Sequence, residues 1–362
     1  MRATTQALTI GLLAFSLLLG LGQAMAADIP SDDDTDNTLG ATVASNPPEI
    51  SAVDITNAAD TSLMHTQLDV GTTYYFNLTI RDPDGWGDLQ WANVQIWFDG
   101  GSSEIAYTAQ TTGANYRVNL NYTNVAPLTD PALSEWSITE GNAVYASGSS
   151  SIFTNVNQEN YTFKLAFTLN NQIRQASEPT STGPSVGYND LDSWNMQVRA
   201  RDFGNPDVFV RDAAGSGSGV HFEFGVFQFN NVSIGANWDA GTISPGGDAT
   251  TALVTVTHVA NDNYRLSVWF DTHLVDGGNT IDITNVNITA AGDAGDAISS
   301  DTFFAGLGIG NRVYIHGSGA STRAHDTAGD SQTTGVQFGV SVPFGTPSGT
   351  YVANLTIRVE TP

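Results

Sequence analysis

Three aspartates lie close together where one segment of alternating apolar and polar residues ends and another begins. Residues 81–88 read Arg-Asp-Pro-Asp-Gly-Trp-Gly-Asp and stand between the alternating segments 74–80 and 94–98. Calcium prefers oxygen ligands and takes about 6–8 of them in a flexible geometry. Asp82, Asp84 and Asp88 can supply several of these oxygens from one turn. The stretch therefore predicts a calcium site.

Two further aspartates, Asp202 and Asp207, follow another alternating segment, residues 194–200. In an immunoglobulin-like sandwich, the loops after strands B and F lie at the same end of the domain. If residues 74–80 form strand B and residues 194–200 form strand F, Asp202 and Asp207 approach the first acidic stretch. Five carboxylates at one corner would repel one another strongly unless a cation neutralised them.

Two other interpretations of this stretch remain open. Asp-Pro-Asp-Gly is an ordinary turn sequence, because proline fixes φ and glycine accepts a positive φ. Arg81 and Arg201 can offset the negative charge in place of an ion, and the spacing of the acids does not match an EF-hand loop. The prediction is a calcium site or a plain turn at Asp82, Asp84, Asp88, Asp202 and Asp207.

Trp86 and Trp97 are candidate binding residues. Trp97 is out of phase with the apolar residues of segment 94–98, so it points away from the expected core. Exposed tryptophans suit stacking on a sugar or contact with another subunit. The alternative is that a loop or a second domain covers this face.

Asn-x-Ser/Thr sequons are frequent, and they are the acceptor sequence for N-glycosylation. Chance alone would give a similar number in a chain so rich in Asn, Ser and Thr. Two of the asparagines fall on the polar faces of expected strands, which suits a surface sugar. The candidate sites are Asn77, Asn121, Asn160, Asn231, Asn287 and Asn354.

Alternation of apolar and polar residues predicts antiparallel strands along most of the chain. Each expected strand has one apolar face for a core and one polar face for solvent. We therefore predict an all-β fold with two tandem Ig-like antiparallel β-sandwich domains. The clearest segments are residues 49–55, 74–80, 94–98, 116–122, 161–169, 194–200, 264–270, 336–342 and 351–359.

The chain divides by composition. Arg2, an apolar run at 7–22 and Ala24-Met25-Ala26 predict a cleaved secretory signal peptide at residues 1–26. An acidic segment follows, which is either a flexible leader or an arm that adds a strand to a neighbouring subunit. The predicted order is signal peptide 1–26, leader or assembly arm 27–47, sandwich with long loops 48–212, Gly/Ser linker 213–219 and second sandwich 220–362.

Charge and cysteine content limit the classes of partner. The formal charge is −25, Lys164 is the single lysine and there is no cysteine. So negative a chain repels nucleic acid and anionic lipid, and it attracts divalent cations. Without disulfides, an exported chain must gain its stability from large cores. We expect an exported protein that does not insert in the membrane after signal cleavage.

Two parts of the chain resemble a known class of domain. Residues 80–89 with 94–98, and their companion 194–202, are similar to Ig-like β-sandwich domains of archaeal secreted and cell-surface proteins, S-layer-like ones among them. Residues 342–351, which lead into the last expected strand, resemble the end of repeated surface modules of this kind. The resemblance implies a domain type and a location at the cell surface.

The motifs favour a structural role over catalysis. No catalytic constellation stands out in the sequence, and the chain has no cysteine nucleophile. The leading hypothesis is a non-enzymatic subunit of an S-layer, sheath or extracellular filament that assembles through sandwich edges or the N-terminal arm, with calcium as the candidate ion. Its partners would be further copies or other envelope proteins. The alternative is a secreted adhesin or carbohydrate-binding protein with glycan partners, and a secreted hydrolase is the third hypothesis.

Overall fold

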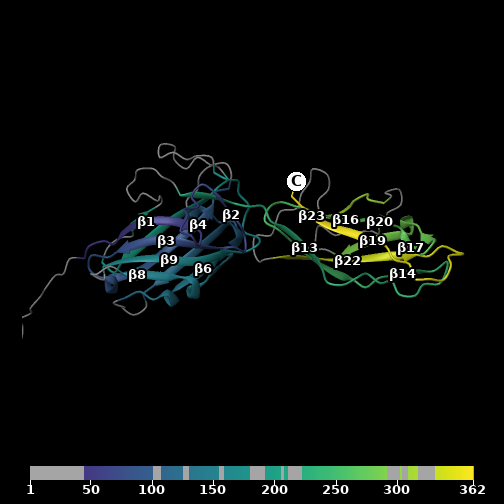
Figure 1. Ribbon diagram of the computed structural model, residues 1–362, viewed down its shortest axis with the longest axis horizontal. Helices are drawn as coiled ribbons and strands as arrows, with labels where there is room; N and C mark the ends of the chain where they lie inside the picture. Colours follow the sequence, from purple (N-terminus) through teal and green to yellow (C-terminus); the bar gives the residue numbers. More distant parts are fainter. Residues whose placement is uncertain are drawn as a thin grey trace, which may run out of the picture. The chain divides into compact units, whose positions relative to one another are not determined.

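The computed structural model describes residues 45–100, 107–124, 130–154, 159–179, 192–204, 208–210, 222–291, 302–303, 309–316 and 331–361. The predicted signal peptide, most of the predicted leader and the predicted linker 213–219 lie outside these ranges. The described residues are all-β, with sheets that are antiparallel except for the parallel pair β2–β12, and they contain no α-helix (Figure 1). Within them, no helix is long and apolar enough to cross a bilayer.

Two sheets form the first sandwich, as predicted from the alternating segments. One sheet has the order β1-β3-β9-β7 with β8 also paired to β9, and the other has the order β2-β12-β10-β4-β5-β6 with β11 paired to β10. The first consists of β1 (Glu49–Thr56), β3 (Thr73–Arg81), β7 (Ala143–Tyr145), β8 (Ser151–Thr154) and β9 (Asn160–Leu169). The second consists of β2 (Gln67–Leu68), β4 (Leu89–Phe98), β5 (Arg117–Thr123), β6 (Trp136–Gly141), β10 (Trp194–Asp202), β11 (Val208–Val210) and β12 (Glu223–Val226).

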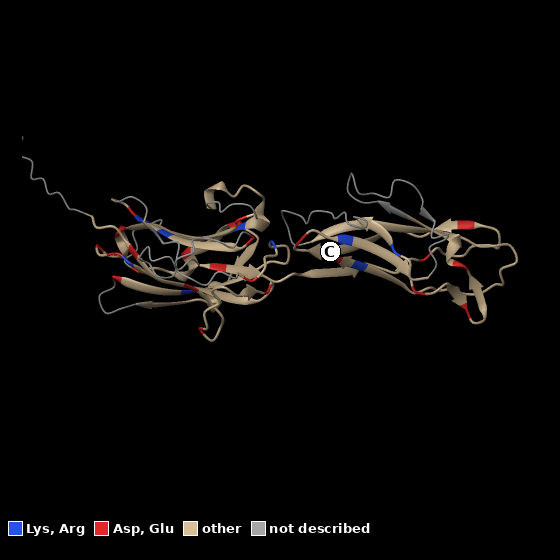
Figure 2. Cartoon of the chain, turned by 90° about the horizontal axis from the view of Figure 1, so that it is seen from above, with Lys and Arg blue, Asp and Glu red and all other residues tan. Residues whose placement is uncertain are grey.

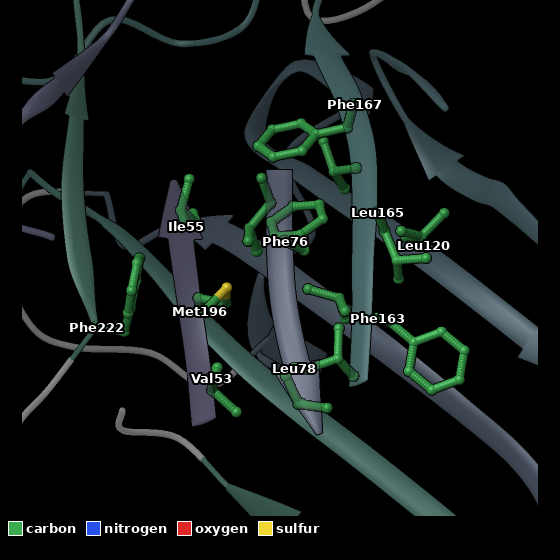
Figure 3. Close-up of a cluster of buried hydrophobic side chains, with 14 of the residues drawn as sticks. Val53, Ile55, Phe76, Leu78, Leu120, Phe163, Leu165, Phe167, Met196 and Phe222 are labelled. Atoms are coloured by element: carbon green, nitrogen blue, oxygen red, sulfur yellow. The ribbon is translucent and has the colours of Figure 1, made fainter. Parts of the chain in front are cut away.

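The two sheets share one hydrophobic core (Figure 3). The alternating residues of β3 and β9 supply much of it, and the rings of Phe76 and Phe167 stack with centroids 3.9 Å apart. Leu120 of β5 and Met196 of β10 face them from the other sheet. The period of two in these strands therefore placed the core residues correctly.

Short 3-10 helices join several strands of this sandwich. They are η1 (Trp86–Asp88), η2 (Tyr107–Ala109), η3 (Ala114–Tyr116), η4 (Leu133–Glu135) and η5 (Ser147–Ser149). The first of them, η1, lies in the short connection between β3 and β4. It forms the last three residues of the acidic turn 82–88.

A second sandwich has its own core. Its larger sheet has the order β13-β15-β22-β19-β20 with β14 paired to β22, and its smaller sheet has the order β21-β16-β23. The larger sheet consists of β13 (Asn230–Ile234), β14 (Asp248–Thr250), β15 (Val254–Ala260), β19 (Val286–Ala291), β20 (Thr302–Phe303) and β22 (Gln332–Ser341). The remaining elements are β16 (Arg265–Phe270), β21 (Val313–His316), β23 (Leu355–Glu360), the hairpin β17 (Leu274–Asp276) and β18 (Asn279–Ile281), and η6 (Ile283–Asn285).

The structure moves two predicted boundaries. Residues 223–226 were expected in the second domain, but β12 pairs with β10 and β2 of the first sandwich. The second sandwich therefore begins with β13 at Asn230. The last strand was predicted from residue 351, yet β23 begins at Leu355, and Val352 instead pairs with Val275 of β17.

The predicted polar face of the strands is not open to solvent on β4 and β10. Gln95 is 5% exposed and Asn195 is 1% exposed, although both alternate with core residues. The side-chain amide of Gln197 donates to the side-chain oxygen Oε1 of Gln95, so these two glutamines are paired with one another. These two central strands are buried on both faces, which alternation alone does not reveal.

Candidate functional site

Trp86 fastens the turn between β3 and β4 to the core of the first sandwich. Its side chain is 1% exposed, and its indole N–H donates to the hydroxyl of Tyr122 at 2.7 Å. Its ring also packs edge-on against Tyr161, with centroids 4.9 Å apart. Gly85, directly before η1, has φ 92°, a value that favours glycine. The buried ring of Trp86 and the positive φ of Gly85 therefore hold the turn in place.

This anchoring places Asp82 inside the protein. Its backbone N–H donates to the carbonyl oxygen of Glu159 at 3.0 Å, and its own carbonyl accepts from Gly85 at 3.1 Å. Its side chain is 0% exposed. One carboxylate oxygen, Oδ1, accepts from the backbone N–H of Asp84 at 3.0 Å. The other oxygen, Oδ2, is buried and has no hydrogen-bond partner.

Three carboxylates meet at this end of the first sandwich, and Ser45 connects a fourth to them. Oxygens of Asp82, Asp84 and Asp88 lie within 4.8 Å of one another. The hydroxyl of Ser45 lies 2.9 Å from Asp88 Oδ2 and 3.2 Å from Asp202 Oδ2, so Asp202 at the end of β10 joins the same group. Asp207, the fifth predicted ligand, lies outside the described residues. We call the group of Asp82, Asp84, Asp88 and Asp202 the acidic corner.

Sequence reasoning did not find three residues that complete the corner. Ser45 and Asn46 precede β1, and Asn46 donates to Asp84 from both its backbone N–H and its side-chain amide. Gly204 follows β10, and a Cβ on this residue would lie 2.7 Å from the Cβ of Ser45. Only the absence of a side chain at Gly204 lets Ser45 reach Asp202. No pattern in the sequence marks these contacts between distant segments.

The electrostatics of the corner differ from one carboxyl to the next. Burial raises the pKa of Asp82 to about 6, and the negative charges of Asp88 and Asp202 act in the same direction. The hydrogen bonds from Asn46 instead lower the pKa of Asp84, which is exposed. A buried carboxyl and an exposed one therefore stand side by side.

The neighbouring arginine does not neutralise this corner. Arg81 forms ion pairs with Glu49 at 3.1 Å and with Glu159 at 3.6 Å. Within the described part of the chain, no ion pair involves Asp82, Asp84 or Asp88. Acidic residues also outnumber basic ones along the described chain (Figure 2).

The tryptophans proposed as binding residues are both buried, which corrects that prediction. Trp86 and Trp97 are each 1% exposed. Trp97 does point away from the sandwich core, but Tyr107 of η2 covers it, with ring centroids 6.0 Å apart. In this structure neither ring is open for stacking on a sugar. For Trp97, the structure instead agrees with the alternative that a loop covers this face of the sheet.

The six candidate glycosylation asparagines differ in their surroundings. Asn231 on β13 and Asn354 before β23 are exposed. Asn77 donates to the hydroxyl of Thr56 at 2.7 Å, and Asn121 donates to that of Thr123 at 2.8 Å. Asn160 and Asn287 are half-buried. The geometry therefore suits a sugar best at Asn231 and Asn354.

Comparisons with known proteins identify no family. No family model matches the chain, and no curated protein matches it. Among solved structures, the C-terminal domain of the Streptococcus agalactiae AgI/II polypeptide BspA is 11% identical, with coverage of 86% of this chain and 96% of that one and a TM-score of 0.21.

Two other solved structures give similar values. The C-terminal domain of the Streptococcus pyogenes antigen I/II-family protein AspA is 11% identical over 86% of this chain and 95% of that chain, with a TM-score of 0.23. A chaperone–tip adhesion subunit complex of Acinetobacter baumannii Csu pili is 11% identical over 75% and 85%, with a TM-score of 0.25. Likeness at this level carries no argument about function. The resemblance to archaeal surface proteins stays a prediction.

Proposed function

We propose that this chain is a non-enzymatic structural protein of the cell surface. It is exported and assembles with further copies or with other envelope proteins into an S-layer, sheath or extracellular filament. The observation that carries the proposal is a regular sheet edge on the second sandwich, whose residues are mostly exposed, although Asn230 at its start donates to the hydroxyl of Thr361 after β23. Export itself is supported by the N-terminal signal sequence.

The edge is β13. Within the described strands it pairs with β15, in unbroken register from Asn230 opposite Ala260 to Ile234 opposite Val256. Ile234 is 44% exposed. A regular edge strand presents a row of backbone donors and acceptors to which a strand from another chain can add. This is the mode of assembly that a sandwich edge supports.

The β1 edge of the first sandwich is less suited to strand addition. The register of β1 with β3 shifts between Ser51 and Asp54, and Ala52 within this bulge has φ 53°. Bulges twist an edge strand away from a regular ladder and so block pairing with a further strand. We therefore assign assembly to β13, with the predicted arm 27–47 or a second β13 as the added strand.

Buried polar groups of the second sandwich support a non-enzymatic role. His258 and His316 are each 1% exposed, and both ring Nε2 atoms lie within hydrogen-bond distance of the Thr334 hydroxyl, at 3.1 Å and 2.7 Å. Two histidines near a hydroxyl can suggest acid–base chemistry. Their burial keeps them from a substrate, so we interpret them as part of the core.

The test is assembly of the purified chain with calcium, followed by electron microscopy and light scattering. We expect ordered sheets or filaments from the wild type. Ile234→Lys places a charge on the β13 edge and should prevent assembly. The matched control is Leu253→Lys, because Leu253 is 55% exposed but lies between β14 and β15, and it should assemble normally. Wild-type monomers that persist at all calcium and protein concentrations would contradict the proposal.

Glycan mapping by mass spectrometry gives an independent check. Asn231 lies on β13, and a sugar at this residue would occupy the edge that we assign to strand addition. We expect Asn231 to be unmodified in assembled protein, whereas Asn354 is open to modification. Full occupancy of Asn231 in native assemblies would exclude β13 as the assembly edge.

An adhesive role is the second candidate, and one exposed ring favours it. Phe344 is 89% exposed on the turn after β22. An exposed aromatic ring is a common contact for sugars and proteins. Saturable binding to a glycan array that Phe344→Ala abolishes would favour the adhesin hypothesis over a purely structural role.

A further inference from the structure

We propose that the acidic corner binds one calcium ion and that the Ser45 hydroxyl is a neutral ligand of the same ion. The site lies where three separate parts of the chain meet: the segment before β1, the β3–β4 turn and the end of β10. This inference does not depend on whether the chain assembles.

The buried oxygen of Asp82 is the observation that points to a ligand. Asp82 is 0% exposed, and its Oδ2 has no hydrogen-bond partner. A buried polar atom without a partner is destabilising, and a buried charge without a partner more so. This oxygen needs a proton or a cation, and it lies within a group of carboxylates that already carries excess negative charge. A cation bound here would coordinate Asp82 Oδ2 and would also reduce the repulsion between the carboxylates.

Among the described side chains, none forms an ion pair with an acid of the β3–β4 turn. Arg81, the nearest arginine in sequence, is engaged by Glu49 and Glu159. Within the described residues, Asp82, Asp84 and Asp88 take part in no ion pair. The turn therefore brings carboxylates together without a protein counter-charge of its own.

The donor set selects calcium among common ions. Every candidate ligand atom is an oxygen, from carboxylates and one hydroxyl, whereas zinc prefers nitrogen and sulfur ligands. Calcium accepts about 6–8 oxygens in irregular geometry, and four carboxylates with Ser45 can provide that number. Magnesium demands a near-ideal octahedron and keeps several waters, which suits a crowded group of side chains less well.

Gly204 indicates that the approach of Ser45 is built into the fold. A Cβ at Gly204 would come within 2.7 Å of Ser45 Cβ and 2.9 Å of Ser45 Oγ. Asn46 meanwhile holds Asp84 by two hydrogen bonds. An ion at this corner would therefore link the segment before β1 to the β3–β4 turn and to β10.

Calorimetric titration of the full chain, first stripped with EGTA, tests the site with calcium chloride as the probe near neutral pH. We expect saturable binding of one ion by the wild type and a loss of at least about a hundredfold in affinity for Asp82→Asn, which keeps the shape but removes the charge. Asp248→Asn is the matched control, because Asp248 is an exposed acid on the second sandwich, and it should bind as the wild type does. A parallel titration with magnesium chloride should show weaker binding.

A second variant and a hydrogen-exchange measurement separate loss of calcium binding from loss of folding. If Asp82→Asn is unfolded by circular dichroism, Asp88→Asn takes its place, because Asp88 is only half-buried. Hydrogen exchange at the backbone amide of Asn46 should slow when calcium is added to the wild type and should not respond in the variant that lost binding. Absence of saturable calcium binding by the wild type, or full affinity in a folded Asp82→Asn or Asp88→Asn variant, would overturn the proposal. An unchanged affinity in folded Ser45→Ala would remove Ser45 from the ligand set.

Discussion

Asp82 of the first sandwich and Asp282 of the second occupy similar turns and behave in opposite ways. Each accepts a backbone N–H from the residue two positions later, at 3.0 Å from Asp84 and at 2.9 Å from Thr284. This bond lowers the pKa of exposed Asp282. Burial outweighs the same bond at Asp82 and raises its pKa to about 6. Burial in the fold, and not the local turn motif, therefore decides the direction in which the pKa of each aspartate shifts.

The anchoring of each turn explains the difference. Trp86 packs in the core and anchors the β3–β4 turn there, so that Asp82 is buried as well. Asp282 begins η6 on an exposed loop, with the ring of His273 at 3.8 Å. One turn therefore has a carboxylate with an unsatisfied buried oxygen, and the other has a solvated cap.

Truncation of the anchor should have the largest effect. Trp86→Ala removes a ring that is 1% exposed, and we expect a loss of about 3–5 kcal/mol in the free energy of unfolding. Trp238→Ala is the matched change in the second sandwich, where the ring is only partly buried, and it should cost less. Urea unfolding followed by circular dichroism measures both. A larger loss for Trp238→Ala would contradict the anchoring role of Trp86.

The pH dependence of stability should separate the two aspartates in calcium-free buffer. The pKa of Asp82 is about 6 in the folded chain, against about 3.9 when unfolded, so folding favours its protonated form. Its contribution is complete below about pH 4 and is lost as the pH rises through about 6, a change of about 3 kcal/mol. Asp82→Asn should abolish this loss, and Asp282→Asn should leave it in place. An identical pH profile for wild type and Asp82→Asn would refute the effect of burial.

The strands and the acidic stretch could be predicted from sequence, but the completed corner could not. Alternation located β3 and β9 with their core residues, because a period of two is a local property of a strand. The proximity of Asp202 to the first three acids followed from an assumed topology. Ser45, Asn46 and Gly204 enter the corner through contacts between distant segments, and no local pattern encodes such contacts.

Trp97 also shows that contacts between distant segments could not be predicted from local sequence. The phase of Trp97 correctly indicated a side chain that points away from the sandwich core. It could not indicate that Tyr107 covers this ring, because the covering segment comes from elsewhere in the chain. For the same reason the buried amides of β4 and β10 were mistaken for a solvent face.

Filling the space beside Ser45 should have an intermediate effect. Gly204→Ala places a methyl group 2.7 Å from Ser45 Cβ, and we expect a loss of about 1–3 kcal/mol in stability together with weaker calcium binding. Gly148→Ala is the control, because a Cβ on Gly148 meets nothing within 4 Å, and its effect should be small. Thermal unfolding with and without calcium measures both variants. Equal behaviour of the two would show that close approach at Gly204 is unimportant.

Removal of the solvated cap should have the smallest effect. Asp282→Ala deletes the acceptor for the Thr284 N–H, and we expect a loss of about 1 kcal/mol. Calcium should stabilise this variant as much as it stabilises the wild type, since Asp282 lies outside the acidic corner. A calcium response that depended on Asp282 would break the contrast between the two turns.

The most direct test of the central claim is a crystal structure of the chain grown with calcium, with anomalous scattering used to locate the ion. We predict an anomalous peak within about 2.3–2.6 Å of oxygens from Asp82, Asp88 and Asp202, with Asp82 Oδ2 among its ligands. An acidic corner without a peak at saturating calcium, with Asp82 Oδ2 hydrogen-bonded to water or protonated against a neighbouring carboxylate, would contradict it.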